Sequence, residues 1–195
     1  MDGTPYVLGP NVDSDSSVFD RAGQRVPLRW LVERMIVRSS NLATNTLIEV
    51  LDARRVDATA RSLGATNMKV LRGVEDGMAF RQGLNNVTSA RDLATLLEAI
   101  ALGNAASRAS CAQMLEILAA QEFNELIPAR LPSGTRVAHK TGWITATTHD
   151  AAIIYPPRRA PYVLVILTRA IPRRADAQQL MAGISRDVWD AITRQ

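Results

Sequence analysis

Apolar residues recur every three or four positions along much of the first two thirds of the chain. This spacing places them on one side of a helix, so it predicts a series of amphipathic helices. Pro27 suits the first turn of the first helix, and Gly64 suits the end of the third. The predicted helices span residues 27–38, 41–51, 52–64, 89–100 and 107–120.

The spacing of apolar residues changes to every second position after a Pro-Ser-Gly turn at residues 132–134. This alternation predicts three strands, and the short links between them favour an antiparallel meander. A last helical stripe, within residues 175–193, should cover one face of the sheet. The predicted fold class is therefore α/β, of the α+β kind. The predicted strands span residues 137–141, 151–155 and 162–168, with a loop at 142–150.

Two segments show neither spacing and are predicted to be irregular. Residues 1–26 contain glycines, prolines and a polar Asp-Ser-Asp-Ser-Ser run. Residues 65–87 contain three glycines and the acidic pair Glu75 and Asp76, and a loop of that length is usually functional or mobile. The predicted organisation is an irregular segment at 1–26, a helical lobe at 27–132 and a sheet with a C-terminal helix at 133–195.

The composition is that of a folded globular protein. Of the 195 residues, 47% are hydrophobic and 22% are charged. The net charge of +4 comes from arginines that stand singly or in pairs without interleaved aromatic residues, which argues against a nucleic-acid partner. No apolar stretch approaches the roughly 20 residues of a membrane span, and the N-terminus resembles no signal peptide. The single cysteine, Cys111, lies in an apolar helical stripe and is predicted to be a buried thiol.

The clearest chemical candidate lies at the end of the first predicted strand. Lys140 is one of only two lysines among 23 basic residues, and Thr141 and Gly142 follow it. A Lys-Thr-Gly tripeptide carries little information alone, because any three-residue string recurs by chance. His139 and the neighbouring His149–Asp150 suggest a His-Asp pair, but a third metal ligand or a serine partner is not evident, so a metal site and a histidine triad are disfavoured.

Two upstream segments give this tripeptide a context. Ser39 and Asn41 form a Ser-x-Asn at a predicted helix junction about 100 residues before Lys140, with Asn45 one turn further on and an acidic loop at 72–76 following. This order resembles class A β-lactamases and penicillin-binding serine hydrolases, whose motifs include Ser-Asp-Asn and Lys-Thr-Gly. The resemblance covers roughly residues 25–195.

The resemblance implies hydrolysis of a β-lactam, or of a related amide or ester, through an acyl-serine in a cleft between two lobes, with no metal or cofactor. Lys140 would hold the substrate carboxylate, and Ser39 would relay a proton to the leaving nitrogen. The amide of Asn41 and the backbone N–H of Trp143 would bind substrate oxygens. The implied catalytic residues are Ser39, Lys140 and Glu75, and the implied substrate-binding residues are Asn41, Asn45, Thr141, Gly142 and Trp143.

Three features depart from the pattern of this family. The nucleophile motif Ser-x-x-Lys is absent, because no serine precedes a lysine by three positions. Ser40 stands where many class A members have aspartate. Glu75, implied to activate the deacylating water, follows Arg72 in an Arg-x-x-Glu spacing instead of the common Arg-x-Glu-Pro. We therefore expect the chain to be N-terminally incomplete, and either inactive or completed by a segment supplied from elsewhere.

An incomplete fold of this kind leaves an unpaired sheet edge, which favours oligomerisation or a swapped dimer. The alternative to an enzyme is a non-catalytic remnant that binds an acyl-D-Ala-D-Ala-like ligand or a partner protein. Structural alternatives also remain for single residues: Ser39–Asn41 as a helix cap, Glu75 as a solvated charge and Trp143 as cover for a cleft edge. Proteins of this family are usually exported, whereas this sequence shows no signal peptide, so the localisation stays open.

Overall fold

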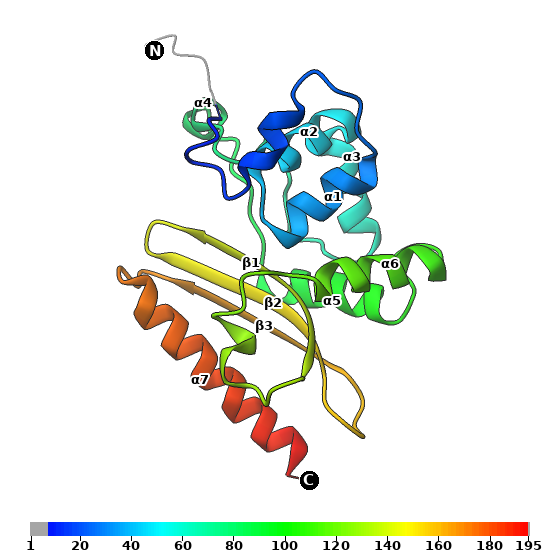
Figure 1. Cartoon of the computed structure of the whole chain (residues 1–195), viewed down its shortest axis with the longest axis vertical. Helices are drawn as coiled ribbons and strands as arrows, with labels where there is room; N and C mark the ends of the chain where they lie inside the picture. The colour runs from blue at the N-terminus through cyan, green and yellow to red at the C-terminus, as the bar shows by residue number, and fades with distance from the viewer. Residues whose placement is uncertain (1–7, 195) are drawn as a thin grey trace. The chain divides into compact units, whose positions relative to one another are not determined.

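The computed structural model describes residues 8–194 (Figure 1). The chain forms two compact units, one within residues 1–88 and the other within residues 89–195. The predicted irregular segment 1–26 thus begins outside the described residues, and its described part contains a short 3₁₀ helix, η1 (Ser16–Arg21). Among residues 8–194, no helix combines the length and the apolar character needed to cross a membrane.

The first unit is helical. Polar side chains fix where two of its helices begin: Ser40 Oγ accepts from the Ala43 N–H, and Asp52 accepts from the Arg54 N–H. The described helices are α1 (Leu28–Val37), α2 (Asn41–Leu51), α3 (Ala53–Ser62) and α4 (Gly77–Arg81). The first three confirm the helices predicted from apolar spacing. A core of Val18, Leu31, Ala43 and Leu47 lies among η1, α1 and α2.

The segment between α3 and the end of the first unit is more ordered than the sequence predicts. Lys69 and Val87 form an antiparallel bridge with backbone hydrogen bonds of 2.9 and 3.1 Å. Asn86 Oδ1 accepts two backbone N–H groups of this segment, and α4 lies within it. The prediction of a structureless stretch at 65–87 is therefore wrong in part. Hydrogen bonds between distant positions order this segment, and the spacing of apolar residues does not reveal such bonds.

The second unit is organised around a three-stranded antiparallel sheet of order β1-β2-β3 (Figure 1). The strands are β1 (Arg136–Ile144), β2 (Thr147–Tyr155) and β3 (Tyr162–Arg169). This sheet confirms the predicted meander, but the predicted loop at 142–150 is wrong. Instead, β1 and β2 continue to a tight turn at residues 145–146, where Ala146 has a φ of 54°. Consecutive polar residues at the start of β2 hide the alternation there.

Helices pack against this sheet. They are α5 (Ala90–Ala101), α6 (Arg108–Ala119), the 3₁₀ helix η2 (Ile127–Arg130) and α7 (Arg174–Thr193). The C-terminal helix α7 contacts β2, β3 and η2, and its Met181 and Trp189 share a core with Val137 and Ile154 (Figure 1). This packing confirms the helix predicted to cover the sheet, and with it the predicted α/β class. Because α5 contacts β2 and β3, and α6 contacts β1, the compact units divide after Thr88 and not near residue 132.

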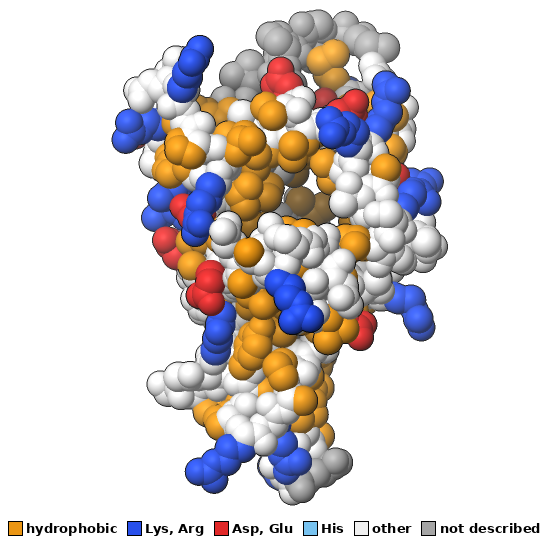
Figure 2. All heavy atoms as spheres, turned by 90° about the vertical axis from the view of Figure 1, so that its right-hand side faces the viewer, with side chains coloured by type: hydrophobic (Ala, Val, Ile, Leu, Met, Phe, Trp, Pro, Cys, Tyr) orange, Lys and Arg blue, Asp and Glu red, His pale blue; other side chains and the backbone are white. Residues whose placement is uncertain are grey.

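Figure 2 shows the Lys and Arg side chains standing singly or in small groups over the face it displays. This distribution matches the scattered arginines of the sequence.

Candidate active site

Lys140 lies near the end of β1, and its amine is largely enclosed. Its Nζ donates to the carbonyl oxygen of Thr141 at 2.6 Å. Burial lowers the pKa of the Lys140 amine from 10.5 to about 8, and the charge of Asp150 opposes part of this fall. The amine is therefore mostly a cation at pH 7. In such surroundings a cation attracts an anion more strongly than in water.

Thr141 and Gly142 follow Lys140 and leave hydrogen-bonding capacity and room beside it. Thr141 is 4% exposed, and its hydroxyl oxygen has no hydrogen-bond partner in the part of the chain that the structure describes. Buried polar groups without a partner are uncommon and ask for an explanation. A Cβ at Gly142 would meet no atom within 4 Å. Thr141 therefore keeps an unused hydrogen-bonding group at this end of β1, among the described residues.

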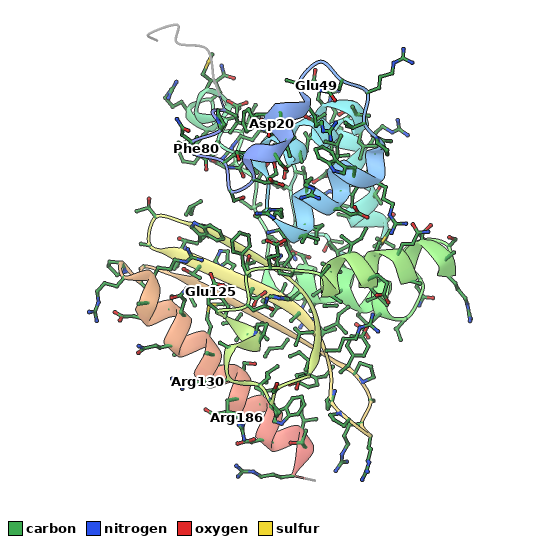
Figure 3. The ribbon with its side chains drawn as sticks, viewed as in Figure 1. Asp20, Glu49, Phe80, Glu125, Arg130 and Arg186 are labelled. Carbon is green, nitrogen blue, oxygen red and sulfur yellow. The ribbon has the colours of Figure 1, made fainter. Side chains whose placement is uncertain are left out.

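Trp143, the next residue, is held from two sides. The ring of Phe123 meets it edge-on, with ring centroids 5.5 Å apart and an interplanar angle of 74°. The guanidinium of Arg174 lies 4.1 Å from the Trp143 ring centroid and donates through Nη2 to Glu125 at 2.8 Å; Glu125 is labelled in Figure 3. These contacts fix the ring of Trp143, and they do not involve its backbone N–H.

A buried polar network, which the sequence only hints at, lies on the strands beside the tripeptide. His139 and Asp150 are 1% and 0% exposed, and His139 Nδ1 lies 3.0 Å from Asp150 Oδ1. Asp150 Oδ2 accepts from the Ile127 N–H at 3.1 Å, and His139 Nε2 lies 3.3 Å from Asn124 Oδ1. The hairpin register is the signal that reveals the pair of His139 and Asp150. It sets Asp150 opposite Thr141, and His139, two residues earlier on β1, lies on the same face of the sheet as Thr141. Among the described residues, no three His, Cys, Asp or Glu side chains form a group that could hold a metal ion.

Ser39, Ser40 and Asn41 form the junction between α1 and α2 in the first unit. Ser39 has a φ of 57°, in the left-handed region that residues other than glycine rarely adopt. Ser40 is buried and caps α2, and Asn41 is the first residue of that helix. Within this motif, the residue that caps the helix is therefore Ser40. The roles of Ser39 and Asn41 toward a substrate stay predictions.

Asn45 and Glu75 lie on α2 and in the loop after α3. Asn45 Oδ1 accepts from the Val74 N–H at 2.7 Å, and Asn45 Nδ2 donates to the Val74 carbonyl at 3.0 Å. These two bonds tie the loop to α2. Glu75 follows with an exposed side chain and a φ of 59°. The structure thus gives Asn45 a role in holding the loop, while the substrate contacts of both residues stay predictions.

The predicted site residues fall into two groups, one in each compact unit. Each group is positioned by contacts within its own unit, as described above. The group within residues 1–88 comprises Ser39, Asn41, Asn45 and Glu75, and the group within residues 89–195 comprises Lys140, Thr141, Gly142 and Trp143.

The helices, the antiparallel sheet and the Lys-Thr-Gly strand are those of a β-lactamase-like serine hydrolase fold. A family model described as the beta-lactamase enzyme family matches residues 11–192. The chain therefore belongs to the beta-lactamase enzyme family, and the resemblance noted in the sequence is confirmed.

Known members of the family support this assignment. A beta-lactamase of Bacillus amyloliquefaciens is 31% identical over 153 residues, which cover 76% of this chain and 50% of that protein. An ancestral class A beta-lactamase structure matches with a TM-score of 0.80 at 30% identity, covering 92% of this chain and 71% of the other. A variant of PBP-A, solved as an acyl-enzyme complex with penicillin G, matches with a TM-score of 0.79 at 30% identity, covering 87% and 63%. The chain spans about half the length of the curated relatives it matches.

Proposed function

We propose that the chain carries the substrate-holding part of a site that opens a β-lactam, or a related amide or ester, through an acyl-serine. The observation that carries this proposal is the end of β1, where Lys140, whose enclosed amine is a cation, is followed directly by Thr141, whose buried hydroxyl has no hydrogen-bond partner among the described residues. A substrate carboxylate is an acceptor for both groups, and such charge-assisted bonds are the strong ones. Membership of the beta-lactamase enzyme family supports the same chemistry.

The residues divide the work of acyl transfer as follows. Lys140 binds the carboxylate and Ser39 relays a proton to the leaving nitrogen. Asn41 donates its side-chain amide to the substrate, and the Trp143 N–H stabilises the oxyanion. Glu75 activates the water that releases the acyl group. The exposed position of Glu75 requires the substrate, or a movement of its loop, to exclude bulk water from this carboxylate.

We further infer that these 195 residues bind substrate without forming an acyl-enzyme on their own. The sequence holds no Ser-x-x-Lys, so it offers neither the nucleophile nor the lysine that activates it. Two functions fit this state. The chain acts in catalysis when another segment supplies the nucleophile, or it acts as a binding protein for penicillin-like or acyl-D-Ala-D-Ala-like ligands.

Penicillin binding and intact mass, measured on the same sample, test the proposal. We expect binding by ligand-observed NMR with no gain in protein mass and no hydrolysis of a chromogenic cephalosporin. Thr141→Val, which keeps the side-chain shape and removes the hydroxyl, should weaken binding about tenfold. Thr145→Val, at an exposed position two residues past Trp143, is the matched control. A mass adduct, or hydrolysis that Ser39→Ala abolishes, would show that the chain is an enzyme by itself; absence of binding would remove the substrate-holding role.

A further inference from the structure

The polar run at residues 13–17 contacts the junction between α1 and α2. Ser14 Oγ lies 2.6 Å from the carbonyl oxygen of Arg38 and 2.7 Å from that of Ser39, so its single hydroxyl hydrogen is shared between the two carbonyls that follow α1. The left-handed conformation of Ser39, with a φ of 57°, costs a non-glycine residue roughly 1 kcal/mol or more. Ser14 thus helps to hold a strained residue in place.

Asp13 binds the other side of the same junction. Its Oδ2 accepts from the Leu42 N–H at 2.8 Å and from the Ser40 hydroxyl at 3.4 Å. The Leu42 N–H belongs to the first turn of α2, whose amides have no partner within the helix and where a negative charge is favourable. Asp13 Oδ1 accepts from the Asp15 N–H at 2.9 Å, so both carboxylate oxygens are engaged.

Asp15 fixes the run against α1. It is 4% exposed, and its Oδ1 accepts from the Ser17 N–H at 3.1 Å and from the Ser17 hydroxyl at 2.6 Å. Its Oδ2 lies 3.7 Å from Arg34 Nη1 and 3.8 Å from Arg38 Nε. Because this buried carboxylate faces two arginines of α1 and its end, the run has one defined place beside the junction.

We propose that Asp13 is a positioning residue for Ser39 and Asn41, and that its carboxylate replaces the aspartate that many class A members carry at the position of Ser40. Ser40 keeps the helix cap through the Ala43 N–H at 3.2 Å, while the negative charge comes from a residue 27 positions earlier. The inference rests on the proposed function, since the geometry of Ser39 and Asn41 affects a ligand only if they contact one.

Replacing Asp13 and Ser40 singly and together tests the exchange of the carboxylate. Asp13→Ala should weaken penicillin binding about tenfold, or about 1.4 kcal/mol, which is the size of a lost helix cap. Ser40→Asp alone sets two carboxylates side by side, because Ser40 Oγ lies 3.4 Å from Asp13 Oδ2, and should lower the melting temperature. In the Asp13→Ala background the same Ser40→Asp change should restore binding to within about threefold of the original. If Asp13 acted only through packing, Ser40→Asp would not restore penicillin binding in the Asp13→Ala background.

The backbone ¹⁵N–¹H signals of Ser39 and Leu42, with the side-chain amide of Asn41, give a readout that needs no ligand. They should shift in Asp13→Ala and return in the double variant. Asp20→Asn is the control, because Asp20 is exposed on the neighbouring η1 and loses the same charge (Figure 3).

The proposal is overturned if Asp13→Ala lowers the melting temperature but leaves these signals unchanged, or if Ser40→Asp does not restore them. Should the original chain bind no penicillin, the proposed function fails, while the amide signals still decide the positioning role. If Asp13→Ala does not fold, Asp13→Asn, which keeps the shape and one acceptor, carries the same comparison.

Discussion

Lys140→Met should stabilise the protein at neutral pH, because the enclosed amine of Lys140 is held as a cation at a cost. The fall of its pKa from 10.5 to about 8 corresponds to about 3 kcal/mol against the charged form. Methionine has a similar length and no charge. The change also removes the hydrogen bond of 2.6 Å from the Lys140 amine to the Thr141 carbonyl, and this loss offsets roughly 1 kcal/mol of the gain. A net gain of about 2 kcal/mol in the free energy of unfolding is therefore expected at pH 7.

The gain should depend on pH in a defined direction. Between about pH 8 and 10.5 the unfolded chain holds the Lys140 proton and the folded chain does not, so the stability of the original protein rises with pH across this window. The cost is complete below about pH 8 and absent above about pH 10.5. The advantage of Lys140→Met should therefore shrink through the window and end as a small deficit.

Urea unfolding of both proteins at several pH values from 7 to 10.5 measures this difference. Tyr155 and Tyr162, whose pKa values are raised by burial, titrate in both proteins and cancel in the comparison. Lys69→Met, at the only other lysine and at an exposed position, is the matched control. A loss of stability at pH 7 would show that favourable pairing of the Lys140 amine outweighs its burial, and a difference that stays constant with pH would show that the pKa of this amine is not lowered.

Two further outcomes are expected. Gly73→Ala should lower the free energy of unfolding in urea by about 1–3 kcal/mol, because its Cβ would lie 2.6 Å from Asn45 Oδ1, which accepts from the Val74 N–H. Gly9→Ala, with no atom within 4 Å of its Cβ, is the control and should be nearly neutral. Equal effects of the two changes would refute this. The outer strand β3 carries no charged residue from Tyr162 to Thr168, so it should pair with the same strand of a second copy. Light scattering should show this association, and added salt should strengthen it by screening the flanking arginines. A monomer at all protein concentrations and salt levels would contradict it.

The elements that the sequence predicts well are those whose apolar period continues to their ends. α7 follows its stripe over twenty residues, and α5 and α6 are capped by Ser89 and Ser107, whose side chains accept from helix N–H groups. The hairpin of β1 and β2 is longer than predicted, because a strand continues through polar residues once its neighbour supplies hydrogen bonds. Local spacing thus locates elements and places their ends poorly.

Contacts between distant positions account for the rest. The bonds from Asp13 and Ser14 to the α1–α2 junction span 24 to 29 residues, and nothing in a polar run of five residues indicates its partner. The pairing of His139 with Asp150 depends on one hairpin register, and a shift by one residue would place the two side chains on opposite faces of the sheet. The residues that hold the candidate site are therefore less predictable than the motifs themselves.

Two features of the chain oppose its stability, and each lies at a residue that the family resemblance assigns to substrate. Lys140 is charged in an enclosed position, and Ser39 is held in a left-handed conformation. An apolar side chain at the first position and a glycine at the second would lower these two costs. Under the proposed function, the cation binds an anionic substrate and the Ser39 side chain presents its hydroxyl, so each cost falls on a residue with a proposed role. Two such costs are expected of a chain that engages ligand, even though its own sequence supplies no Ser-x-x-Lys nucleophile.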